Sequence, residues 1–141
     1  MKNPEVLLYE EVNSEKLLSI LNQAYISGHL DDDGDIVADV DGHTILLTLN
    51  KRNKLIKFTA LYSLKDSFPL ELKHSLTNLM NDDVILSRFS VPDIDANVLV
   101  SDYFLPYEAG VLEQNIISSL RMMSRINSHA IRYCDPQDII N

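Results

Sequence analysis

The strongest constraint on the fold is the dipeptide Asp41-Gly42, which separates the apolar runs "DIVADV" and "HTILLTLN". An Asp-Gly pair favours a two-residue hairpin loop, because both central residues of a type I′ turn require a positive φ. A third run, "LIKFTALYS", follows after the four residues "KRNK", whose length is typical of a longer hairpin loop. The sequence therefore predicts a three-stranded antiparallel meander.

The register of the meander follows from its turns. With Asp41-Gly42 at the tip, Val40 faces His43; with four residues in the next loop, Asn50 faces Leu55. Side chains alternate between the two faces of a strand. The predicted core face carries Ile36, Ala38, Val40, Ile45, Leu47, Leu49, Ile56, Phe58, Ala60 and Tyr62. The opposite face carries Val37, Asp39, Thr44, Leu46, Thr48, Lys57, Thr59 and Leu61.

Three segments have the apolar periodicity of amphipathic helices. The first, "NSEKLLSILNQAYISG", has Asn13 as its N-cap and Gly28 as its predicted C-terminal stop. The second, "PLELKHSLTNLMND", begins at Pro69, which suits a first helical turn. The third, "GVLEQNIISSLRMMSRINSHAIRYC", is stopped by Asp135-Pro136.

Two further strands, "VILSRFSV" and "NVLVSDYFL", precede the last helix and carry large apolar residues on both faces. Two apolar faces indicate that both are covered, by the domain itself or by another chain. The order is helix, three-stranded meander, helix, two strands, helix, which predicts one α+β domain over residues 1–141 with helices on one sheet face. The apolar residues left for a protein-binding or dimer surface are Leu46, Leu61, Leu86, Leu99, Tyr103 and Leu105.

The stretch "HLDDDGDIVADVDGHT" places six aspartates between Asp31 and Asp41 and raises the question of a calcium loop. An EF-hand loop requires acids at positions one, three and five, glycine at six and glutamate at twelve. With Gly34 at six, His29 falls at one and Val40 at twelve, so the first and last ligands are missing. We expect no metal site, and interpret Asp31 to Gly34 as a turn that leads out of the first helix.

The same aspartates make a poor catalytic site. Asp33 and Asp35 lie in a predicted exposed turn, whereas an acid–base pair needs one carboxyl group buried. The four histidines share no metal-ligand spacing, and His129 with Cys134 forms one weak pair. The sequence predicts no catalytic, cofactor-binding or metal-binding residue. The alternative hypothesis is a metal-dependent or hydrolytic enzyme that uses the Asp31–Asp41 cluster.

Charge and hydropathy restrict the partners. Twelve Lys and Arg against 21 Asp and Glu give a net charge of −9, which opposes binding to nucleic acid. No apolar run approaches the roughly 20 residues that span a bilayer, and the first residues lack the apolar segment of a signal peptide. We therefore expect a cytoplasmic protein that contacts neither nucleic acid nor membrane.

The sequence resembles the YbjN family of bacterial proteins. The resemblance rests on "DDDGDIVADVDG" before an apolar strand, "ALYSL", a Pro-led helix, two strands and "EAGVLEQNIISSLRMM", and it covers roughly Ser14 to Asn127. It implies a type III secretion chaperone-like fold and a non-enzymatic sensory-transduction regulator with no established active site.

The residues and the resemblance together predict a regulatory or chaperone-like protein-binding module of the bacterial cytosol. We expect it to form a homodimer and to bind an unidentified protein partner, without a cofactor.

Overall fold

The computed structural model describes residues 5–141, which divide into two compact units. The first unit contains the chain up to Phe58 together with Phe104–Met122, and the second contains Thr59–Tyr103 and Met123–Asn141.

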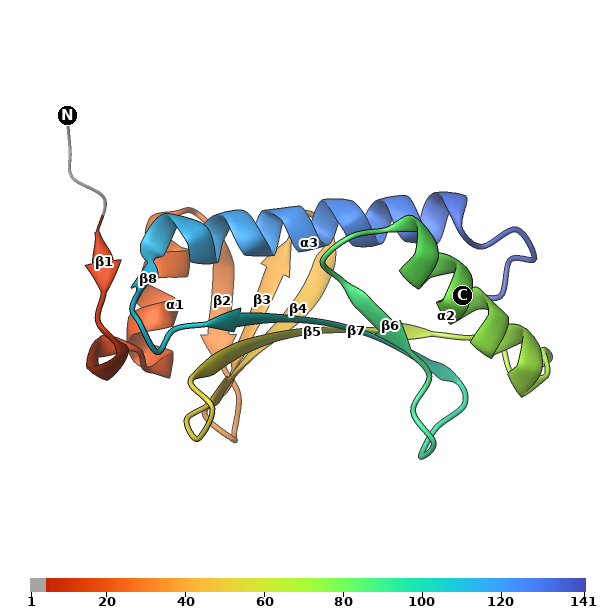
Figure 1. Ribbon diagram of the computed structural model, residues 1–141, viewed down its shortest axis with the longest axis horizontal. Coiled ribbons are helices and arrows are strands. Elements are labelled where there is room, and N and C mark those ends of the chain that lie inside the picture. Colours follow the sequence, from red (N-terminus) through yellow and green to blue (C-terminus); the bar gives the residue numbers. More distant parts are fainter. Residues whose placement is uncertain (1–4) are drawn as a thin grey trace. The chain divides into compact units, whose positions relative to one another are not determined.

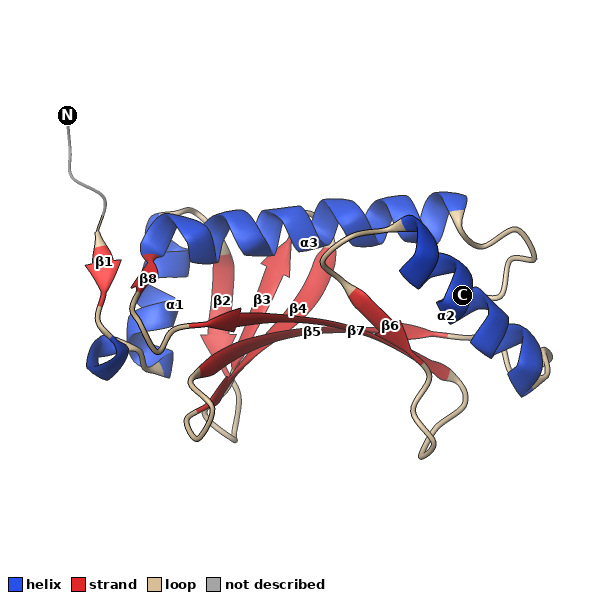
Figure 2. Cartoon of the chain, in the orientation of Figure 1, coloured by secondary structure: helices blue, strands red, loops and turns tan. Residues whose placement is uncertain are grey.

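The described chain is an α+β fold, as predicted (Figures 1 and 2). Its main sheet has six strands in the order β2-β3-β4-β5-β7-β6, and β1 and β8 form a separate antiparallel pair. Antiparallel pairing joins β2 to β3, β3 to β4 and β6 to β7. The elements are β1 (Val6–Leu7), a 3₁₀ turn (Tyr9–Glu11), α1 (Ser14–Gln23), β2 (Ser27–Leu30), β3 (Ile36–Val40), β4 (His43–Asn50), β5 (Leu55–Ser63), α2 (Leu70–Asp83), β6 (Arg88–Ser90), β7 (Val98–Pro106), β8 (Val111–Leu112) and α3 (Glu113–Tyr133).

The hairpin at Asp41-Gly42 is confirmed. Both residues have the positive φ of a type I′ turn, 49° and 84°, and Val40 pairs with His43. The predicted core face is also confirmed. Its buried members are Ile36, Ala38, Val40, Ile45, Leu47, Ile56, Phe58 and Ala60, while Leu49 and Tyr62 are partly buried.

The predicted end of the first helix is wrong. The N-cap is Asn13, whose Oδ1 accepts a hydrogen bond from Lys16 N–H at 2.8 Å, but the helix ends at Gln23 rather than at Gly28. Tyr25, with a φ of 61°, occupies the left-handed position that glycine usually fills, and Ile26 N–H bonds to Leu21 C=O at 2.9 Å.

Because the helix stops early, Ser27–Leu30 form a strand, β2, that the sequence did not predict. The meander therefore has four strands. Asp31 to Gly34 form the hairpin turn between β2 and β3, and not a turn that leads out of the helix.

The predicted strand over "VILSRFSV" shrinks to the three residues of β6. Leu86 has a φ of 70°, and Ser87 N–H donates to Ile85 C=O at 2.8 Å, which makes a γ-turn with a positive central φ. Ile85 and Leu86 thus lie outside the sheet, because a residue in that conformation cannot continue a strand.

The second unit has its own hydrophobic core. Side chains of α2 and of the end of α3 pack over the inner residues of β6 and β7 in this unit. The buried members of this core are Leu64, Leu76, Met80, Phe89, Leu99, Ala130, Cys134, Ile139 and Ile140. The C-terminal segment is fixed to it by Asp135, whose two carboxylate oxygens accept from the backbone N–H groups of Ile139 and Ile140 at 2.8 and 2.9 Å.

The third helix was predicted from Gly110, but it begins at Glu113, since Val111 and Leu112 pair with β1 as strand β8. Gly110, with a φ of 90°, makes the turn that leads into β8. None of the helices within residues 5–141 is both long and apolar enough to cross a bilayer.

Candidate protein-binding surface

The structure does not bring the six predicted surface residues onto one face. Leu99 is completely buried in the core of the second unit, so it contributes nothing to an exposed surface. Tyr103 lies on the same face of β7 as the buried Leu99 and Ser101 and is itself partly buried, and Leu105, in the first unit, is also partly buried. Leu46, in the first unit, lies between Ile45 and Leu47, which are buried on the core side of β4. Its side chain therefore points away from the core side.

Leu61 and Leu86 remain as exposed members in the second unit. Leu61 is 63% exposed and lies on β5 opposite to the core side, and Leu86 is 50% exposed in the γ-turn before β6. We define the outer surface as the outward side chains of β5, β6 and β7 in this unit together with two residues of the γ-turn. Its members are Thr59, Leu61, Arg88, Val100 and Asp102 from the strands, and Ile85 and Leu86 from the turn.

A polar group lies at the centre of the outer surface. Asp102, only 5% exposed, accepts a hydrogen bond from Thr59 Oγ1 at 3.1 Å and pairs with Arg88 Nη2 at 3.2 Å. Arg88 and Asp102 are direct partners in the β6–β7 register. Charged groups held within an apolar surface fix the orientation of a partner more than they add affinity.

The core side of the same strands is covered by helices. Phe89 and Leu99, which face that side, share the core of the second unit with Leu76 and Met80 of α2. Leu61, on the outward side, is 63% exposed. One face of this part of the sheet is therefore covered by helices, and the other face leaves an apolar side chain exposed to solvent.

The γ-turn at Leu86 adds strained apolar surface. Ile85 is 73% exposed, and the positive φ of Leu86 is unfavourable for a side chain that carries a Cβ. The next residue, Ser87, has a buried hydroxyl for which the described residues supply no hydrogen-bond partner. Backbone strain of this kind concentrates at functional sites.

The acidic turn between β2 and β3 is organised by Asp31. Its Oδ1 accepts from the backbone N–H groups of Asp33 at 3.0 Å and of Asp35 at 2.9 Å. One carboxylate oxygen from each of these three aspartates lies within 4.8 Å of the others. Burial, together with the charges of Asp31 and Asp33, raises the pKa of Asp35. This turn is the only place within residues 5–141 where ligand atoms of three acidic, histidine or cysteine residues gather so closely.

His129 and Cys134 converge on one carboxylate rather than on each other. Asp83 Oδ2 accepts from Cys134 Sγ at 3.2 Å and lies 3.1 Å from His129 Nε2. Burial, followed by the hydrogen bond to Asp83, raises the pKa of Cys134 to about 11. The thiol is therefore mostly protonated at neutral pH, which makes it a poor nucleophile.

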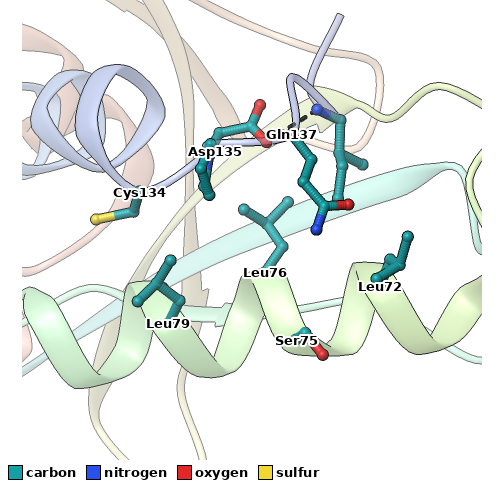
Figure 3. A pocket seen from close by; sticks show the side chains of 9 residues that line it. Leu72, Ser75, Leu76, Leu79, Cys134, Asp135 and Gln137 are labelled. Atoms are coloured by element: carbon teal, nitrogen blue, oxygen red, sulfur yellow. Dashed lines mark hydrogen bonds between the residues drawn. The ribbon is translucent and has the colours of Figure 1, made fainter.

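A small pocket of about 150 Å³ lies beside Cys134, between α2 and the C-terminal segment (Figure 3). Leu72, Leu76 and Leu79 line it from α2. Two of its polar side chains already have partners: Asp135 holds the C-terminal backbone, and Ser75 Oγ donates to Glu71 C=O at 3.0 Å. Neither of these two groups is arranged as a base beside a nucleophile.

Sequence reasoning missed a buried polar group in the second unit. Asn127, which is 0% exposed, lies within 3.2 Å of Ser101 Oγ through its Oδ1 and donates to the Tyr62 hydroxyl at 3.0 Å. The signal was present in the sequence, because Asn127 falls between Met123 and Ala130 on the apolar stripe of α3. A buried amide that joins two strands to a helix fixes their relative position.

Comparisons with known proteins agree with this architecture. The family model "YbjN: Putative bacterial sensory transduction regulator" matches residues 13–135. The crystal structure of YbjN, "a putative transcription regulator from E. coli", is similar with a TM-score of 0.75 and 17% identity, over 92% of this chain and 96% of that one. An uncharacterized protein from Methanothermobacter thermautotrophicus is similar with a TM-score of 0.61 and 12% identity, over 88% of this chain and 97% of that one.

No curated protein matches the sequence. At these identities the two crystal structures establish the fold alone, whereas the family model spans most of the chain. This chain belongs to the YbjN family.

Proposed function

We propose that this YbjN-family chain is a non-enzymatic regulator that binds another protein through the outer surface of its second unit. The observation that supports this most directly is the exposure of Leu61 on a sheet face whose opposite side carries the core. The contact is made by apolar side chains around the Arg88–Asp102 pair, which sets its orientation.

The first partner proposed for this surface is a second copy of the chain, and an unidentified protein is the other. The protein acts in the cytoplasm and needs no cofactor for this role. Exposed apolar side chains around one ion pair are typical of surfaces that bind proteins, whereas small molecules bind in concave pockets.

The test is the oligomeric state of the protein and of two matched variants. Light scattering at micromolar concentration should give about twice the 16.0 kDa of one chain. Leu61→Asp should weaken this association about tenfold or more, because it places a charge in an apolar contact. Ile94→Asp, at a loop position that is 98% exposed, is the control and should change nothing. A monomeric wild-type protein would remove the homodimer from the proposal.

The alternative function, an enzyme that uses the acidic cluster, is favoured only by the close approach of Asp31, Asp33 and Asp35. Calorimetric titration with calcium, magnesium and zinc separates the two. Tight stoichiometric binding of any of these ions would support the alternative, and weak or absent binding is the result that we expect.

A further inference from the structure

The two outermost strands of the main sheet, β2 and β6, differ in whether the outward backbone groups of the strand have hydrogen-bond partners. β6 is closed in the second unit: Phe89 N–H donates to Asn81 Oδ1 at 2.8 Å, and Asn81 Nδ2 donates to Phe89 C=O at 2.9 Å. An amide that satisfies both groups prevents another strand from adding there. No side chain among residues 5–141 caps β2, in the first unit, in this way.

The free groups of β2 can be assigned from the register. The Asp41-Gly42 turn makes Val40 and His43 a hydrogen-bonded pair, so Ala38 and Ile36 also bond to β4. Val37 and Asp39 then bond to β2, through His29 and Ser27. Asp31 N–H donates to Asp35 C=O at 2.8 Å, which agrees with this alternation.

The backbone N–H and C=O groups of Gly28 and Leu30 consequently point away from β3, toward the open edge. Within residues 5–141 no backbone or side-chain group from outside the sheet is seen to bond to them. Leu30 is 39% exposed, and a Cβ added to Gly28 would come within 3.2 Å of Leu18 Cδ1. The edge therefore offers two unpaired residues, with α1 packed against one face.

The side chains around this edge are acidic and aromatic. Asp32 and Asp33 follow β2 directly and are exposed, and Asp39, also exposed, is the register partner of Ser27. No salt bridge to any of these aspartates is seen among the described residues. Tyr25, which precedes β2, is 98% exposed and is held in its position by the left-handed helix end.

We infer that the free edge of β2 binds an extended, basic segment of a partner polypeptide, which adds to the sheet as a further strand. Gly28 and Leu30 supply the backbone hydrogen bonds, and the acidic turn and Asp39 attract lysine and arginine side chains on the outward face. The ring of Tyr25 offers a face to one of these cations. Apolar side chains on the other face of the added strand meet Leu30 and Leu18. This inference rests on the proposal that the chain acts by binding protein, but it uses a different surface.

A second copy of the chain is a poorer occupant of this edge, because each copy carries a charge of −9 and would bring its own acidic turn to the interface. The occupant that the charges favour is cationic.

The experiment uses the full chain and a capped peptide of alternating lysine and valine, about seven residues long to match a typical strand. The control peptide has glutamate in place of lysine. Binding is followed by fluorescence anisotropy at low ionic strength, and amide hydrogen exchange is followed by NMR. We expect the lysine peptide to bind and to slow exchange at Gly28 and Leu30, and the glutamate peptide to do neither.

Two pairs of variants make the test specific. Leu30→Pro removes the outward N–H and is compatible with an edge strand, whereas Leu30→Ala keeps it. Only Leu30→Pro should abolish the slowed exchange. Asp32→Asn with Asp33→Asn should weaken binding about threefold to tenfold, since each exposed charge contributes modestly. Asp82→Asn with Asp93→Asn changes the net charge equally in the second unit and should leave binding unchanged.

Three results would overturn the inference. These are equal binding of both peptides, no protection at Gly28 and Leu30, or concentration-dependent protection of these amides in the protein alone, which would show that a second copy occupies the edge. Leu61→Asp distinguishes the two proposals. It should lose self-association and keep peptide binding. Self-association that survives the substitution would overturn the proposed function, whereas loss of peptide binding would overturn this inference.

Discussion

The side chain of Asn81 takes the place of a neighbouring strand for Phe89, because it accepts from the N–H and donates to the C=O of the same residue at 2.8 and 2.9 Å. We expect Asn81→Ala to lower the free energy of unfolding by about 1 kcal/mol, since both groups then depend on water. It should also increase concentration-dependent association, because the edge of β6 is opened. Chemical denaturation and light scattering measure the two effects.

Asn78→Ala is the matched control, because Asn78 is exposed on the same helix. Equal stability of the two alanine variants would show that the cap contributes nothing.

The γ-turn at Leu86 predicts an inverted order of stability. Glycine is normally more destabilising than alanine, but a φ of 70° is strained for any residue with a Cβ. We expect Leu86→Gly to be more stable than Leu86→Ala by about 1 kcal/mol in denaturant unfolding, and both to weaken self-association equally because both remove the apolar side chain. If the alanine variant were the more stable one, the turn would not be strained.

The Asp83–Cys134 hydrogen bond predicts slow thiol chemistry. Because burial and Asp83 raise the pKa of Cys134 to about 11, alkylation by iodoacetamide should be slow at neutral pH and should accelerate only in strongly alkaline solution. Asp83→Asn removes the negative charge, so it should lower the pKa of the thiol and speed the reaction. The pH dependence of the alkylation rate separates this effect from a change in access.

Asp82→Asn, which alters the adjacent residue, should leave that pH profile unchanged. A uniform acceleration of Asp83→Asn at every pH would mean that the substitution opens the structure rather than shifting the pKa.

The acidic turn predicts a pH-dependent stability. The pKa of Asp35 is raised in the folded state, so its contribution to stability is present below its usual pKa and is lost as the pH rises through the folded value. We therefore expect Asp35→Asn to match the wild-type Tm at about pH 3 and to exceed it at about pH 7. Circular dichroism melts check this.

Asp66→Asn, an exposed acid in the second unit, controls for net charge and should not reproduce the difference. A lower Tm for Asp35→Asn at neutral pH would contradict the repulsion among the three aspartates.

The sequence sufficed for features that local chemistry decides. Asp41-Gly42 fixes the turn, the turn fixes the register, and alternation then assigns Ile45 and Leu46 to opposite faces. Leu61 was placed on the outward face by the same reasoning.

Other features depended on conformations that the residue types disfavour. Tyr25 occupies a position for which glycine is the usual choice, so the helix end was sought at Gly28 and β2 was missed. Leu86 likewise interrupts a segment whose composition is typical of a strand. Leu99 was assigned to the wrong face, because its strand has apolar residues on both sides. The alternation of apolar and polar residues therefore does not indicate which side faces the core. The Asn81 cap is a contact between α2 and β6, and a local sequence pattern does not predict such a contact.

The amide cap on β6 also sets a limit on how large an assembly can grow. A subunit with two free sheet edges can be extended indefinitely, as in a fibril. Among the described strands of the main sheet, β2 alone keeps an open edge, so growth by edge-to-edge pairing of the kind seen in a fibril has no second edge from which to continue.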